Sequence, residues 1–308
     1  MIRLNRYSPV YRLWEGIWNQ PVARAGLTLF LVILAFSLVG AVWTPYSPTA
    51  SAFPPGRPPS LAHPLGTTVF GQDVLSQLMA GGLPVIGIGL GVGAIGTLIS
   101  LLVGTTSGYY ADSAIGKALS WLNQLLLVVP ALIFMMFIAD YMLALHIRLG
   151  YLGLMLVLSV TGWPPSARTI RAQTLTIRRK EFVLSSELIG ERWYRVLFDE
   201  LVPYNLPYIA SAFFFNALYG VFSTALIYYL GLGSLKAVNW GTMLYWSLSS
   251  YAYFTGEWWW YLPPGLMMGL LALSFALMNV GIDVVANPKL RVWRVPRGLK
   301  VVYPQGRA

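Results

Sequence analysis

Residues Leu83 to Tyr110 read LPVIGIGLGVGAIGTLISLLVGTTSGYY, and none of these side chains carries a charge. A helix needs about 20 apolar residues to cross a hydrocarbon core about 30 Å thick, so this stretch predicts a membrane span. It includes Gly91-Val92-Gly93-Ala94-Ile95-Gly96, which matches the G-x-G-x-x-G dinucleotide fingerprint. That fingerprint needs a strand, a turn and a helix in water, and an uncharged span provides none of these.

The glycines of this stretch predict close packing between helices instead. Gly89 and Gly93 are four residues apart, and Ser100, Gly104 and Gly108 form a second set with the same spacing of four. Residues four apart lie on one helix face, and small side chains there let another helix approach closely. We therefore expect all four of these glycines to be helix-packing residues.

The composition extends the membrane prediction to the whole chain. Charged residues make up 10% of the 308 residues and hydrophobic residues 56%, whereas a soluble domain has about 25% charged residues. Further apolar runs cover residues 26–43, 119–139, 149–164, 206–230 and 259–282. Helices satisfy their own backbone polar groups in lipid. The prediction is therefore an all-α integral membrane protein with about six transmembrane helices.

The basic residues set the orientation of these spans. With the N-terminus in the cytoplasm, 18 of the 21 Lys and Arg residues fall in cytoplasmic segments. Those outside are Arg57, Arg148 and Lys236. Cytoplasmic loops carry the excess of Lys and Arg, so both termini are expected in the cytoplasm.

The expected organisation is a single membrane domain with short appendages. Its predicted segments are a cytoplasmic N-terminal segment (1–25), a first transmembrane helix (26–43), an extracytoplasmic loop (44–82), a five-helix core (83–285) and a cytoplasmic C-terminal tail (286–308). The core includes a long cytoplasmic loop, residues 168–205.

Composition also disfavours several kinds of site. There is no cysteine and there are two histidines, His63 and His146, so we expect no metal site and no cofactor. A net charge of +10 would suggest nucleic-acid binding in a soluble protein, but the positions of the charges beside the spans explain it without nucleic acid. Ala114–Ala118 resembles a P-loop only faintly, because the first glycine and the Ser or Thr after Lys117 are missing. Any ATP must therefore be bound by another subunit.

The predicted spans contain mild polar groups and almost no ionisable ones. A proton-coupled carrier usually has a buried carboxylate or histidine in its path, so such a carrier is disfavoured. Asn123, Gln124 and Asn216 lie within the predicted spans. They either line a translocation path or form hydrogen bonds between helices, and the sequence leaves both open.

The cytoplasmic loop holds a pattern of two short helices around Gly190. Gly190 suits the left-handed position that ends a helix. A second short helix is expected over about Arg192–Leu201, and Pro203 and Pro207 mark the start of the fifth span. The apolar residues before the glycine recur at near-helical spacing: Phe182, Val183, Leu188 and Ile189. Such a helix pair suits docking in a groove of a partner, and a solvated, positively charged loop is the equal alternative.

This loop resembles the coupling loop of binding-protein-dependent ATP-binding-cassette (ABC) importers, whose pattern is E-A-A, three residues, then G. Ser185 and Ser186 stand where the two alanines usually are, and Gly190 matches the glycine. Glu181 matches the leading Glu of the longer pattern, and Pro203 stands at the family's proline. The resemblance implies these ATPase-coupling residues: Glu181, Ser185, Ser186, Leu188, Gly190, Arg195 and Pro203.

Other stretches resemble the dipeptide/oligopeptide/nickel branch of these importers. Residues 63–76 resemble H-P-L-G-T-D-x-x-G-R-D-V-L-S, with Thr68 in place of Asp and Gln72 in place of Arg. Pro45–Pro48 resembles P-Y-D-P, Asn239–Leu244 resembles S-W-G-x-M-L, and Asn287–Arg291 resembles D-P-R-L-R. These matches follow the family's order along the chain.

The resemblance implies a type I importer permease in the plasma (inner) membrane of a prokaryote. The implied partners are a second homologous permease, two ATP-binding cassette ATPase subunits and an extracytoplasmic solute-binding protein. The chain itself is then not an enzyme. Di- or oligopeptides are the implied solutes, with nickel chelates or oligosaccharides as alternatives. A secondary carrier or channel, a lipid-acting enzyme and an assembly factor remain competing functions.

Overall fold

The computed structural model describes residue 18, residues 20–144 and residues 150–286. Four stretches of helix are long and apolar enough to cross a membrane. Three of them are α2 (Pro21–Val42), α3 (Val74–Tyr109) and α13 (Trp258–Ala286), and the fourth contains α10 (Val202–Tyr229). The all-α membrane prediction is confirmed. Most of the predicted C-terminal tail and of the N-terminal segment, and the stretch Asn287–Arg291, lie outside the described residues.

Two pairs of shorter helices follow α3 along the chain. The first pair is α4 (Ala114–Val128) and α5 (Ala131–Ala144), and the second is α6 (Tyr151–Gly162) and α7 (Pro164–Arg178). The third predicted span, residues 119–139, is divided between α4 and α5. The helix stops before Pro130, because proline lacks the backbone N–H and its ring clashes with the carbonyl four residues earlier.

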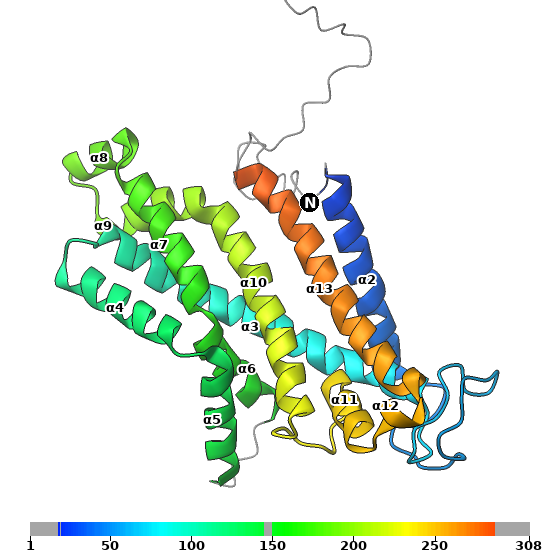
Figure 1. Cartoon of the computed structure of the whole chain (residues 1–308). Helices are drawn as coiled ribbons and strands as arrows, with labels where there is room; N and C mark the ends of the chain where they lie inside the picture. The colour runs from blue at the N-terminus through cyan, green and yellow to red at the C-terminus, as the bar shows by residue number, and fades with distance from the viewer. Residues whose placement is uncertain (1–17, 19, 145–149, 287–308) are drawn as a thin grey trace, which may run out of the picture.

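The two ends of the molecule differ in character (Figure 1). The start of α2, the end of α13 and the short helix α8 (Glu181–Leu188) lie together at the top of the view. The opposite end holds the long loop after α2 and the short helices α11 (Trp240–Ser249) and α12 (Ala252–Thr255). Because the basic segments belong to the first end, it is the cytoplasmic end.

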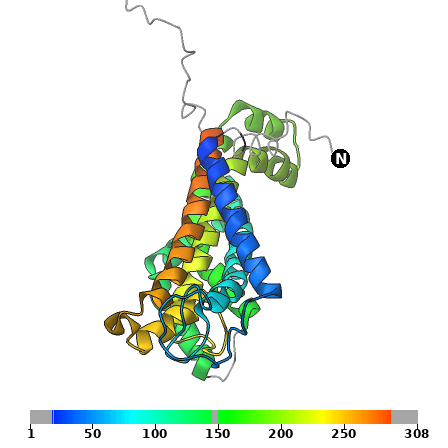
Figure 2. The same cartoon turned by 90° about the vertical axis from the view of Figure 1, so that its right-hand side faces the viewer.

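Helix α3 is the central element of the fold. Its 36 residues correspond to a length of about 54 Å at 1.5 Å per residue, more than a membrane core is thick, and it runs obliquely through the molecule (Figure 1). It packs chiefly against α10, α7 and α2, while α2 and α13 pair along one edge (Figures 1 and 2). The main core includes Ile86, Val221, Trp240, Leu271 and Phe275.

The start of α3 differs from the predicted boundary at residue 83. The helix begins at Val74, because Asp73 occupies the N-cap and its side chain accepts a hydrogen bond from the Ser76 N–H. Such a cap satisfies one of the free donors of the first helical turn. Pro84 lies inside α3, so it does not interrupt the helix.

Candidate functional site

The cytoplasmic corner around Gly190 has the left-handed geometry that the sequence predicts. Gly190 has φ +81°, and its N–H donates to the Glu187 carbonyl (3.1 Å) while the Glu191 N–H donates to the Ser186 carbonyl (3.0 Å). These two bonds form a Schellman motif, which ends a helix at a left-handed residue. A Cβ at Gly190 would meet no heavy atom within 4 Å. The glycine is therefore required by its backbone conformation and not by lack of space.

The second arm of the corner is continuous with the fifth span. It comprises α9 (Trp193–Arg195) and the π-helical segment η1 (Val196–Leu201), which runs directly into α10. A separate helix ending before Pro203 was expected, and this expectation is wrong. Pro203 cannot donate to the carbonyl of Asp199, and the wider π turn just before it accommodates the proline within one helix. The corner is thus joined rigidly to α10.

A small apolar cluster anchors α8 to this second arm. Val183 of α8 is fully buried, as are Val196 and Leu201 of η1. Phe182 and Tyr109 cover the cluster, and the Phe182 ring stacks on the Tyr204 ring with centroids 4.7 Å apart. The inner face of α8 is therefore held by packing.

The two serines of the coupling-loop pattern have different partners. The Ser186 hydroxyl hydrogen-bonds a carboxylate oxygen of Glu200 in η1. Glu200 is partly buried, and its other carboxylate oxygen has no partner among the described residues. The exposed Ser185 hydroxyl donates only to the Glu181 carbonyl in its own helix (2.8 Å). Ser186 therefore joins the two arms of the corner, and Ser185 does not. Sequence reasoning missed Glu200, because its pairing crosses the corner.

The outer tip of the corner presents apolar side chains to the exterior. Leu188 is 88% exposed and Ile189 84%, and Leu184 and Trp193 are about half exposed. A salt bridge between Arg195 and Glu191 (2.8 Å) lies on the surface nearby. Glu181 is the exposed first residue of α8, and Pro203 is the half-buried second residue of α10.

The four predicted packing glycines of α3 contact two different helices. A Cβ on Gly89 would lie 2.5 Å from Val221 Cγ2, and one on Gly93 3.0 Å from Ala217 Cβ, both in α10. Gly104 and Gly108 instead face α7. Their Cβ atoms would lie 2.7 Å from the Ala167 carbonyl oxygen and 2.7 Å from Thr174 Cβ. Helix α3 thus lies closely against α10 near its middle and against α7 near its cytoplasmic end.

The three polar residues proposed for a path do not come together. Asn216 is buried and donates to the Thr97 hydroxyl (3.2 Å) between α10 and α3, which is the arrangement of an interhelical hydrogen bond. Asn123 and Gln124 of α4 line a hollow toward α7, together with Arg168 and Arg171. Asn216 does not belong to that hollow.

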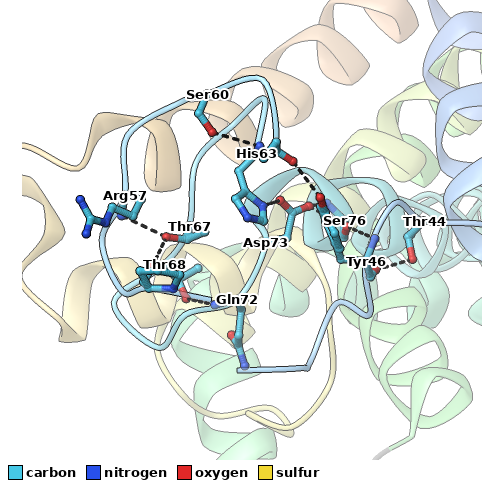
Figure 3. Close-up of polar contacts among 12 residues, drawn as sticks. Thr44, Tyr46, Arg57, Ser60, His63, Thr67, Thr68, Gln72, Asp73 and Ser76 are labelled. Carbon is cyan, nitrogen blue, oxygen red and sulfur yellow. Dashed lines mark hydrogen bonds and ion pairs between the residues drawn. The ribbon is translucent and has the colours of Figure 1, made fainter. Parts of the chain in front are cut away.

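The extracytoplasmic loop is organised around a buried carboxylate (Figure 3). Asp73 is fully buried, and its Oδ1 hydrogen-bonds His63 Nδ1 (2.9 Å). Its Oδ2 accepts from the backbone N–H (2.8 Å) and the hydroxyl (2.6 Å) of Ser76. The rings of Tyr46 and Phe53 lie 4.9 and 4.4 Å from the His63 ring. The loop is therefore tied to the first turn of α3. The sequence did contain a signal for this helix start, because Asp is a preferred N-cap residue. Asp73 stands three residues before Ser76 and just before an apolar run.

The two replacements in this loop preserve its turn without a charge. Thr68 Oγ1 accepts from the backbone N–H groups of Phe70 (3.2 Å) and Gln72 (3.2 Å), the kind of turn that an Asp carboxylate also makes. Gln72 Oε1 accepts from the Gln77 side chain (2.7 Å). Thr67 donates to the Pro54 carbonyl (2.7 Å), and Figure 3 shows how these bonds fold the loop back on itself.

Comparison with known proteins identifies relatives along nearly the whole chain. The family described as binding-protein-dependent transport system inner membrane component matches residues 96–292, or 197 of the 308 residues. The dipeptide transport system permease protein DppC of Bacillus subtilis (strain 168) is 27% identical over 280 residues, covering 90% of this chain and 85% of the relative. The oligopeptide transport system permease protein OppC of the same strain is 26% identical, covering 89% and 87%. The di/tripeptide transport system permease protein DppC of Pseudomonas aeruginosa (strain UCBPP-PA14) is 26% identical, covering 92% and 93%.

Proposed function

The chain belongs to the family of binding-protein-dependent transport system inner membrane components, and from this premise we propose that its solutes are di- or oligopeptides. It is a multi-pass permease subunit of an ABC importer in the inner membrane. ATP hydrolysis belongs to separate ATPase subunits, and a binding protein delivers the solute. The peptide assignment is supported by the relatives, whose names specify dipeptide, oligopeptide and di/tripeptide transport.

The observation that carries the proposed mechanism is the glycine corner on a rigid arm. Leu188 and Ile189 at its tip are largely exposed, and the arm continues without a break into α10. Exposed apolar side chains at the end of a short helix suit docking in a groove of a partner. The tip would sit in a cleft of an ATPase subunit, so that closure of the ATPases displaces α8 and α10 together.

The displacement would switch the permease between two states. Helix α10 packs closely on Gly89 and Gly93 of α3, so a movement of α10 is passed to the centre of the fold as a rigid-body step. ATP binding would then favour one of two arrangements of the packed helices. The assembly that suits this scheme has a second homologous permease and two ATPase subunits, one for each glycine corner.

The test is transport by a reconstituted complex. The chain would be placed in proteoliposomes with its second permease, ATPases and binding protein, and uptake of radiolabelled di- and pentapeptides would be measured with and without ATP. We expect accumulation that requires ATP and every subunit, and no ATP hydrolysis by the purified chain alone. Uptake of a nickel chelate or an oligosaccharide, with no competition by peptides, would disprove the peptide assignment. Accumulation without ATP would disprove the coupling mechanism.

A further inference from the structure

We propose that the hollow between α4 and α7 binds the headgroup of an anionic phospholipid from the cytoplasmic leaflet. We call this hollow the basic pocket. Its volume is about 590 Å³, and its polar lining consists of Ser120, Asn123, Gln124, Arg168 and Arg171. This inference does not depend on which solute is transported.

The basic pocket carries two positive charges that lack an anionic partner. Arg168 and Arg171 form no ion pair within the described residues, whereas Arg178 of the same helix pairs with Asp112 (3.0 Å). The Nε of Arg171 is buried and has no hydrogen-bond acceptor among those residues. Arg168 is exposed and Arg171 is partly exposed, so both guanidinium groups can reach a ligand in the hollow. A phosphate offers paired oxygens that match the geometry of a guanidinium.

Asn123 supplies the pocket with a second unsatisfied group. Its side chain is only 3% exposed, and its Oδ1 has no partner among the described residues. Gln124 beside it donates to the Ser120 hydroxyl (3.2 Å). A ligand that brings both an anion and a hydroxyl donor would satisfy the arginines and this amide together. The glycerol phosphate headgroup of phosphatidylglycerol has both.

The depth of the pocket matches the inner headgroup region. Tyr151 begins α6 at the extracytoplasmic side, and Arg171 follows 20 residues later along α6 and α7. At 1.5 Å per residue the two helices together span at most about 30 Å, close to the thickness of the hydrocarbon core. Arg171 therefore lies near the inner boundary of the core, where basic pockets between helices bind anionic headgroups.

An apolar stripe beside the pocket offers a place for the acyl chains. Trp121, Leu125 and Val128 follow one another at helical spacing on α4 and are 65%, 43% and 82% exposed. Helix α4 packs mainly on α3 and α7, and this stripe faces away from both helices. A free phosphate would use only the basic part, whereas a lipid uses both the charges and the stripe.

The test compares lipid binding by the assembled transporter in nanodiscs. The nanodiscs would contain phosphatidylcholine alone or with phosphatidylglycerol, and the readouts would be the melting temperature and the phosphatidylglycerol retained in native mass spectrometry. Arg171→Gln is compared with Lys117→Gln, which removes the same charge from a residue of α4 outside the pocket lining. We expect the wild type and Lys117→Gln to gain stability from phosphatidylglycerol. Arg171→Gln should bind it about tenfold more weakly, and Arg171→Lys should recover part of the loss.

Three results would overturn the proposal. The first is an equal gain from phosphatidylglycerol in Arg171→Gln and wild type. The second is equal stabilisation of the phosphatidylcholine sample by inorganic phosphate, which would mean a free-anion site. The third combines two observations: phosphatidylglycerol has no effect on wild type, and Arg171→Gln changes the ratio of uptake of free-acid peptide to uptake of C-terminally amidated peptide. This result would mean that the pocket binds the carboxylate of the solute. Uptake in phosphatidylcholine alone reports whether each variant has assembled.

Discussion

Replacing Gly190 with valine should uncouple ATP hydrolysis from uptake while leaving the transmembrane core folded. Gly190 lies at φ +81° at the end of α8, and no heavy atom lies within 4 Å of the position a Cβ would take. The substitution therefore introduces no clash with neighbouring elements. Its effect comes from the backbone, because valine is branched at Cβ and strongly disfavours positive φ.

The magnitude follows from the left-handed conformation alone. An L-residue with a Cβ costs about 1–2 kcal/mol in that region relative to glycine. This is a factor of roughly 5–30 in the equilibrium constant between the native and the relaxed corner. Relaxation of the corner would displace Leu188 and Ile189, the exposed residues of the tip. Asparagine tolerates the left-handed region better than other non-glycine residues, so Gly190→Asn should lose much less.

The assay is the number of peptides taken up per ATP hydrolysed in proteoliposomes. Gly190→Val should lower this ratio by up to a factor of about 5–30, with Gly190→Asn between it and wild type. The melting temperature of the core should be unchanged. Full coupling by Gly190→Val would refute the reasoning. Equal losses in both variants would also refute it, because the left-handed backbone would then not be the cause.

Three further substitutions test the packing and the polar contacts. Gly104→Ala places a Cβ 2.7 Å from a backbone carbonyl oxygen, whereas a Cβ at Gly87 would have nothing within 4 Å. In detergent melts, Gly104→Ala should therefore lower the stability of the protein by about 1–3 kcal/mol, and Gly87→Ala should not. Ser186→Ala removes the hydroxyl that hydrogen-bonds a carboxylate across the corner and should lower the free energy of unfolding by about 1–3 kcal/mol in detergent melts. Ser185→Ala should behave as wild type. Equal effects of the two substitutions would contradict the assignment. Asp73→Ala removes the N-cap of α3 and should cost about 0.5–2 kcal/mol, seen as faster hydrogen exchange in the first turn of α3; unchanged exchange would contradict its capping role.

Several features of the molecule follow from the sequence alone because their causes are local. An uncharged run such as Leu83–Tyr110 is predicted to be a membrane helix because its own side chains prefer lipid. The imbalance of Lys and Arg predicts the orientation in the same way. Gly190 was expected to be left-handed because glycine alone adopts that conformation without strain, and the structure confirms it.

Helix boundaries near prolines were harder to predict, because the same residue has opposite consequences in different surroundings. Pro130 ends α4, whereas Pro84 lies inside α3 and Pro203 lies within the helix that continues η1. The outcome depends on whether the neighbouring turn can widen and whether packing compensates the missing hydrogen bond. Neither condition is written in the local sequence.

The contacts of the candidate sites were decided only by the tertiary structure. Ser186 reaches Glu200, Asn216 reaches Thr97, and Asn123 shares a hollow with residues of α7. The last two of these sets join residues from different helices that are well separated along the chain, and their side chains meet only once the helices have packed. Sequence by itself therefore determined where the chain crosses the membrane and which way it faces, since those depend on transfer of each segment into lipid. Packing decided which polar groups of the described residues are partnered and which are not.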